Sequence, residues 1–152
     1  IMGACRMLLY LMAASAAPAA ALPAAFALGC YVVGITIAAR LEHKNGALPA
    51  ASSMLALALL YTPGIVFAMR FASAGGYPMQ LVILAAFAIL IAYATQMLRK
   101  GGPAISQAVG TLLAGIAIVD ALAVSSVSTT IALGFVALAP ILRLWQRWVA
   151  AT

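Results

Sequence analysis

Charged residues and metal-ligating residues are scarce in this sequence. Of its 152 residues only 7% are charged, and the chain has two acidic residues and one histidine. A soluble globular domain is usually about one quarter charged. The two cysteines, Cys5 and Cys30, lack the spacing of a metal site, and both lie in apolar runs where small side chains serve packing. These shortages exclude an ordinary soluble domain and a cysteine-based metal centre.

Apolar residues are abundant instead: they make up 67% of the chain and gather in long runs. A helix of about 20 apolar residues crosses a bilayer core about 30 Å thick. The runs are continuous rather than alternating, which favours helices over the strands of a membrane barrel. We therefore predict an all-α polytopic membrane protein with one transmembrane domain over residues 1–152 and about six helices. The predicted spans are 3–20, 22–40, 50–69, 79–98, 104–124 and 131–148, with Pro18 and Pro23 marking a tight connection between the first two.

The basic residues test this layout, because alternating spans sort them to two sides. Seven of the eight fall on the side of the N-terminus, and only Arg70 falls on the other. The positive-inside rule then predicts that both termini face the cytoplasm, in what we expect to be a bacterial inner membrane. A basic rim favours anionic lipid headgroups or an anionic substrate head, so the net charge of +6 does not require nucleic acid. The seven are Arg6, Arg40, Lys44, Arg99, Lys100, Arg143 and Arg147.

Polar side chains within or at the ends of the spans are costly in lipid, so each one requires a reason. Arg6 shares a helical face with Tyr10; it either anchors the helix at the interface or points into a cavity to hold an anion. Arg40 and Glu42 close the second span, either as an ordinary charged helix end or as part of a phosphate site. Asp120 is expected to make a helix-packing hydrogen bond rather than to relay protons. One such acid gives weak support to a transporter.

Several stretches of the sequence resemble bacterial UbiA-type intramembrane prenyltransferases. Residues 2–15, which open Met-Gly-Ala-Cys-Arg-Met-Leu-Leu-Tyr, are similar to the fifth helix of that family, and residues 29–42 are similar to the sixth. Residues 110–122 and 146–149 resemble the closing part of such chains. The likeness covers only the C-terminal half of a family member. Together with a start at Ile1, at the edge of a span, it predicts a fragment that lacks the N-terminal helices and the first acidic motif.

The resemblance implies an all-helical enzyme that transfers an isoprenoid from its diphosphate to a lipophilic acceptor, with Mg²⁺ on the diphosphate. The family's second acidic motif should carry two or more aspartates. Here Glu42 is its only plausible remnant and a weak metal ligand, so no catalytic residue is assigned. The implied diphosphate ligands are Arg6, Arg40 and Lys44, and the implied pocket residues are Tyr10, Tyr31 and Thr36.

Two hypotheses therefore stand side by side. The first is a UbiA-like prenyltransferase in which Arg6, Arg40 and Glu42 converge on one cytoplasm-facing cavity. A tight turn between the first two spans would bring the cytoplasmic start of the first and the cytoplasmic end of the second to the same depth. The second is a non-catalytic helical subunit that packs in a larger membrane complex and binds lipid or quinone.

Overall fold

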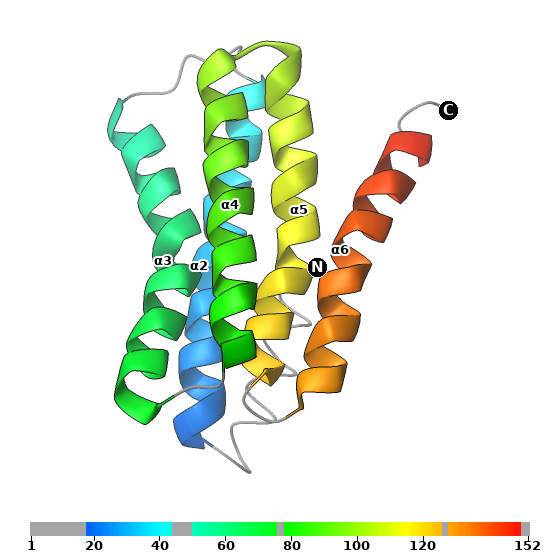
Figure 1. Cartoon of the computed structure of the whole chain (residues 1–152). Helices are drawn as coiled ribbons and strands as arrows, with labels where there is room; N and C mark the ends of the chain where they lie inside the picture. Colours follow the sequence, from blue (N-terminus) through cyan, green and yellow to red (C-terminus); the bar gives the residue numbers. More distant parts are fainter. Residues whose placement is uncertain (1–17, 44–49, 76–77, 126–127, 150–152) are drawn as a thin grey trace.

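The computed structural model describes residues 18–43, 50–75, 78–125 and 128–149, and throughout these ranges the chain forms long helices without strands (Figure 1). The five helices follow one another along the chain in an antiparallel bundle. They are α2 (Pro18–His43), α3 (Ala50–Ala74), α4 (Pro78–Lys100), α5 (Pro103–Val124) and α6 (Thr129–Val149).

Four of these helices are long and apolar enough to cross a membrane: α2, α3, α4 and α5. They confirm the second to fifth predicted spans and the assignment to multi-pass membrane proteins. The apolar stretch of α6, Thr129–Trp145, is shorter and does not reach that length. The first predicted span, residues 3–20, lies almost entirely outside the described residues. The six-span count therefore stays a prediction.

The prediction that Pro18 and Pro23 mark a tight connection was wrong. Helix α2 begins at Pro18 and continues through Pro23 without a break. Pro23 lies inside the helix, and membrane helices tolerate such interior prolines because neighbouring groups satisfy the freed carbonyl. Pro63 in α3 is accommodated in the same way.

Glycines with positive φ end two of the helices. Gly75, with φ of 64°, follows the last turn of α3, so this helix runs five residues beyond the predicted end at 69. Gly101 and Gly102, with φ of 71° and 55°, reverse the chain between α4 and α5. Pro103 then opens α5 at a position that suits its fixed φ.

Helix packing is uneven around the bundle. The most extensive contacts are those of α2 with α3, of α4 with α5 and of α5 with α6, and α2 also packs against α5. Among pairs of consecutive helices, α3 and α4 have the least contact. In Figure 1, α2 lies behind α3 and α4, and α6 leans away from α5 toward its C-terminal end.

Gly34 allows a close contact between α2 and α3. A Cβ added at Gly34 of α2 would lie 3.1 Å from the backbone nitrogen of Leu60 and 3.2 Å from the carbonyl oxygen of Ala56, both in α3. Small residues of this kind are what close packing in lipid requires.

Candidate functional site

Several of the predicted site residues lie outside the part of the chain that the structure describes. Arg6, Tyr10 and Lys44 are outside the described residues. Glu42 belongs to the last turn of α2, but its side chain is not described. The convergence of Arg6, Arg40 and Glu42 on one cavity therefore stays a prediction. That prediction assumed a tight turn between Pro18 and Pro23, and the structure has helix there instead.

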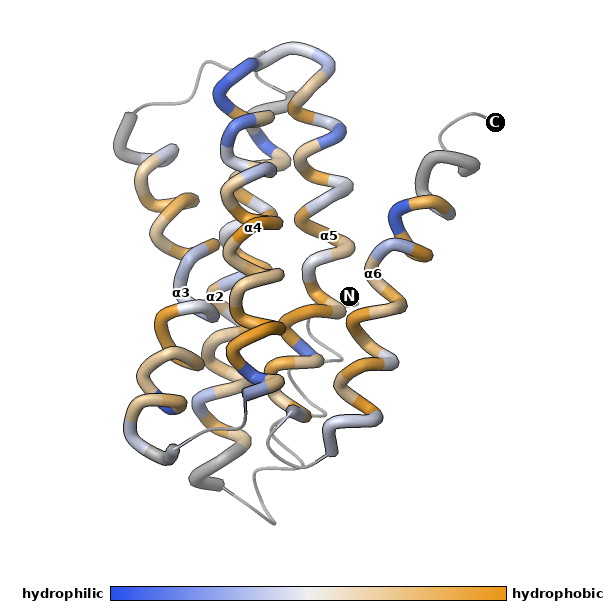
Figure 2. The backbone as a smooth tube through the Cα atoms, in the orientation of Figure 1, coloured by the Kyte–Doolittle hydropathy of each residue, from blue (hydrophilic) through white to orange (hydrophobic). Residues whose placement is uncertain are grey.

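Most of the described basic side chains lie at one end of the bundle. Arg40 is exposed near the end of α2, and Arg99 and Lys100 close α4. These helix ends lie at the same end of the antiparallel bundle, where Figure 2 shows the most hydrophilic part of the chain around the junction of α4 and α5. Arg70, near the end of α3, lies at the opposite end. This separation is the one that the charge pattern predicted for these residues.

Tyr31 is part of the bundle core. Its side chain is fully buried, and its hydroxyl donates a hydrogen bond to the carbonyl oxygen of Leu112 in α5, 2.9 Å away. Its ring lies 5.7 Å from the ring of Phe87 in α4, at an interplanar angle of 56°. Tyr31 thus joins α2 to α4 and α5, and its hydroxyl is already engaged. The prediction that it lines a substrate pocket stays untested.

Thr36, the other described pocket candidate, is exposed on α2. Its hydroxyl donates to the carbonyl oxygen of Val32, 2.8 Å away and one turn earlier. This is the usual way in which a threonine in a membrane helix satisfies its hydroxyl. Neither of the two cavities described below is lined by Thr36 or Tyr31.

Acidic side chains do not form a metal site in the part of the chain that the structure describes. No group of three or more histidine, cysteine, aspartate or glutamate residues comes together there. Asp120 is buried near the end of α5, away from Arg40, and is engaged in a polar or electrostatic interaction. The described residues therefore do not fit Mg²⁺, and Mg²⁺ stays a prediction from the resemblance.

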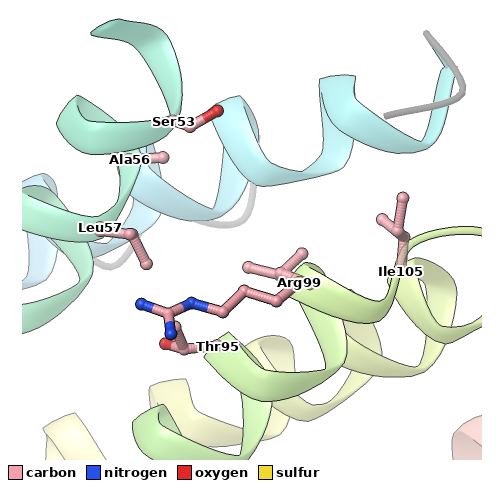
Figure 3. Close-up of a pocket in the computed structure, with 7 residues that line it drawn as sticks. Ser53, Ala56, Leu57, Thr95, Arg99 and Ile105 are labelled. Atoms are coloured by element: carbon pink, nitrogen blue, oxygen red, sulfur yellow. The ribbon is translucent and has the colours of Figure 1, made fainter. Parts of the chain in front are cut away.

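A cavity of about 190 Å³ lies between the start of α3 and the end of α4, at the basic end of the bundle. Figure 3 shows the side chain of Arg99 running back along α4, so that its guanidinium lies beside Thr95. The hydroxyl of Thr95 itself donates to the carbonyl oxygen of Ile91. The cavity is lined by Ser53, Ala56 and Leu57 of α3, by Thr95, Leu98 and Arg99 of α4, and by Ile105 of α5.

The sequence reading missed this cavity. The signal was present in the pair Thr95 and Arg99, which stand four residues apart and so share a helical face. The contribution of Ser53 depends on which helices become neighbours, and a single sequence does not reveal that. The described lining combines one guanidinium, two hydroxyl groups and otherwise apolar side chains.

No family model, curated protein or solved structure matches this chain. Membership in the UbiA-type prenyltransferase family therefore stays a prediction from the resemblance of the residues.

Proposed function

We propose that this chain is part of a UbiA-like intramembrane prenyltransferase. In such a reaction the C–O bond of an allylic diphosphate breaks, and diphosphate leaves with the electron pair. The isoprenoid carbon then bonds to a nucleophilic atom of a lipophilic acceptor, which loses a proton. The structural observation that best supports the proposal is the gathering of basic side chains, Arg40 and Arg99 among them, at one end of an otherwise apolar bundle. An isoprenoid diphosphate has the matching form, with an anionic head and an apolar chain.

Arg40 provides the test, because it is the one described member of the implied diphosphate ligands. Arginine binds phosphate through paired, charge-assisted hydrogen bonds. Losing one such interaction costs about 1.5–3 kcal/mol, or roughly a tenfold to hundredfold loss of affinity. We expect Arg40→Gln to raise the KM for farnesyl or geranylgeranyl diphosphate by that factor. Lys100→Gln removes the same charge from the same end of the bundle and should leave KM within about twofold.

The assay uses the protein expressed from its natural gene and purified in detergent with MgCl₂ in the buffer. Release of diphosphate is followed together with mass spectrometry of extracted lipids for a prenylated product. If a folded protein releases no diphosphate from any prenyl diphosphate across a panel of membrane quinone precursors and lipids, the enzyme proposal fails.

The second candidate is a non-catalytic helical subunit that binds lipid or quinone within a larger membrane complex. It is favoured by one specific observation: the described helices bring no acidic cluster to the basic end, and Asp120 lies toward the opposite end. This candidate predicts no turnover, together with co-purification of partner subunits from membranes solubilised in mild detergent.

A further inference from the structure

The seam between α3 and α4, where these two helices face each other, contains a second cavity. It has a volume of about 260 Å³ and lies further from the basic end than the cavity at Arg99. Its described lining is apolar apart from the hydroxyl of Tyr61, and several members are small, among them Gly64 and Ala68 of α3 and Ala88 of α4. The small side chains and the weak contact between the two helices together leave this space open.

The two cavities occupy one strip along the seam. In α3 the lining residues recur at intervals of three or four positions, some with a direct neighbour, from Ser53 to Ala68, and in α4 they fall on one face from Leu84 to Arg99. Side chains at such spacing share a helical face. At 1.5 Å per residue the strip is about 22 Å long, which is most of a hydrocarbon core of about 30 Å. We call this strip with its two cavities the α3–α4 groove.

The α3–α4 groove is flanked by side chains that face outward from the described bundle. Met54 is 73% exposed, Ile65 is 58% exposed and Ile89 is 70% exposed. Large apolar side chains in such positions contact lipid tails when the helices span a bilayer. A molecule in the membrane can therefore reach the groove from the side.

Charge at one end limits what can occupy this groove. The Arg99 guanidinium is directed along the cavity at the basic end, while the remainder of the strip is almost wholly apolar (Figure 3). A free phosphate ion would leave the larger cavity unfilled, and a wholly apolar molecule would leave the cation without a counterion. A cavity of about 150 Å³ is enough for benzene. The larger cavity here therefore accommodates a segment of hydrocarbon chain.

We propose that the α3–α4 groove binds an anionic glycerophospholipid from the leaflet at the basic end of the bundle. The lipid phosphate would accept hydrogen bonds from Arg99, and one acyl chain would run past Leu57 into the space beside Ala88. This site is separate from Arg40 and does not depend on the prenyltransferase proposal. A bound lipid would fill the seam that α3 and α4 leave open.

Native mass spectrometry of the detergent-purified protein tests the proposal, with phosphatidylglycerol and phosphatidylcholine of identical acyl chains as probes. The unaltered protein should retain one phosphatidylglycerol at least about tenfold more tightly than phosphatidylcholine, as expected for a charge-assisted contact. Arg99→Gln should remove this preference, whereas Arg99→Lys should keep part of it. The matched control is Lys100→Gln, which removes the neighbouring charge and should keep the preference.

A second pair of variants tests the apolar part. Ala88→Leu places a larger side chain in the 260 Å³ cavity and should lower the affinity for both lipids several-fold. Ala137→Leu adds the same side chain to an exposed position of α6 and should change neither affinity. Far-UV circular dichroism establishes that each variant is folded.

Three results would overturn the proposal. The first is equal affinity of the unaltered protein for the two lipids. The second is an equal loss of preference in Arg99→Gln and Lys100→Gln, which would mean a diffuse surface charge. The third is stoichiometric displacement of phosphatidylglycerol by farnesyl diphosphate, which would mean that the groove receives the isoprenoid substrate.

Discussion

Replacing Gly115 of α5 by alanine should be among the most damaging small changes in the bundle. The new Cβ would collide with the hydroxyl oxygen of Tyr31 and lie 3.0 Å from Cδ2 of Leu90. Tyr31 has little room to move, because its ring is fully buried against Phe87 and its hydroxyl is bonded to the Leu112 carbonyl. Overpacking costs about 1–3 kcal/mol, and a lost interhelical hydrogen bond in a membrane protein averages about 0.6 kcal/mol. We expect Gly115→Ala to lower the free energy of unfolding by about 2–3 kcal/mol.

A double-mutant cycle identifies the cause of that loss. Tyr31→Phe removes the hydroxyl and should cost only about 0.5–1.5 kcal/mol by itself. In that background the alanine Cβ meets the ring carbon Cζ at 3.4 Å and the mobile end of Leu90 at 3.0 Å, which are far milder contacts. The two changes should therefore show a coupling energy of about 1–2 kcal/mol.

The assay is equilibrium unfolding by SDS titration in mixed micelles, followed by far-UV circular dichroism. Gly134→Ala is the control, because a Cβ at Gly134 of α6 has no neighbour within 4 Å. It should be neutral, or stabilising by up to about 1 kcal/mol from helix propensity. Strictly additive effects of Gly115→Ala and Tyr31→Phe would refute the steric explanation.

Three further predictions concern other parts of the bundle. Gly34→Ala should destabilise by about 1–3 kcal/mol in the same titration, because its Cβ would press on backbone atoms of α3 that cannot rotate away. In a protein whose native cysteines are replaced, a membrane-impermeant maleimide applied from outside the cell should label Ser73→Cys and not Ser106→Cys. These two exposed serines lie at opposite ends of the bundle. Labelling of Ser106→Cys alone would mean that the topology is the reverse of the predicted one. Tyr93→Leu should lower the free energy of unfolding by about 0.5–2 kcal/mol, and Tyr93→Phe should lower it much less. The reason is that the Arg143 guanidinium lies 5.8 Å from the centroid of the Tyr93 ring. One nitrogen of this guanidinium is buried without a hydrogen-bond partner among the described groups.

The spans were largely predictable from the sequence, because the length of each apolar run determines whether it can form a span. The predicted span over 79–98 became α4 at Pro78–Lys100, and the span over 104–124 became α5 at Pro103–Val124. The error came from applying to Pro23 a proline rule that holds in water. In a bilayer the chain has no alternative to helix that satisfies its carbonyls, so an interior proline bends a helix rather than ending it.

The candidate site was far less predictable. Tyr31 was identified as a notable residue, but a tyrosine in a membrane helix can face a pocket or a neighbouring carbonyl, and only the pairing of α2 with α5 places it against Leu112. The cavity at Arg99 depends in the same way on which helices become neighbours. Hydropathy gives the depth of a residue in the membrane and leaves its partners across the bundle undetermined.

The weak contact between α3 and α4 has a consequence for how the protein is assembled. The described chain from α2 to α5 consists of two helical hairpins, α2 with α3 and α4 with α5, which are held to each other mainly through α2 and α5. The hydrogen bond from Tyr31 to Leu112 crosses that junction. The covalent link between Gly75 and Pro78 is therefore not what keeps the halves together. A gene divided at that point and expressed as two separate chains should yield hairpins that insert independently and then recombine in the membrane through the α2–α5 face.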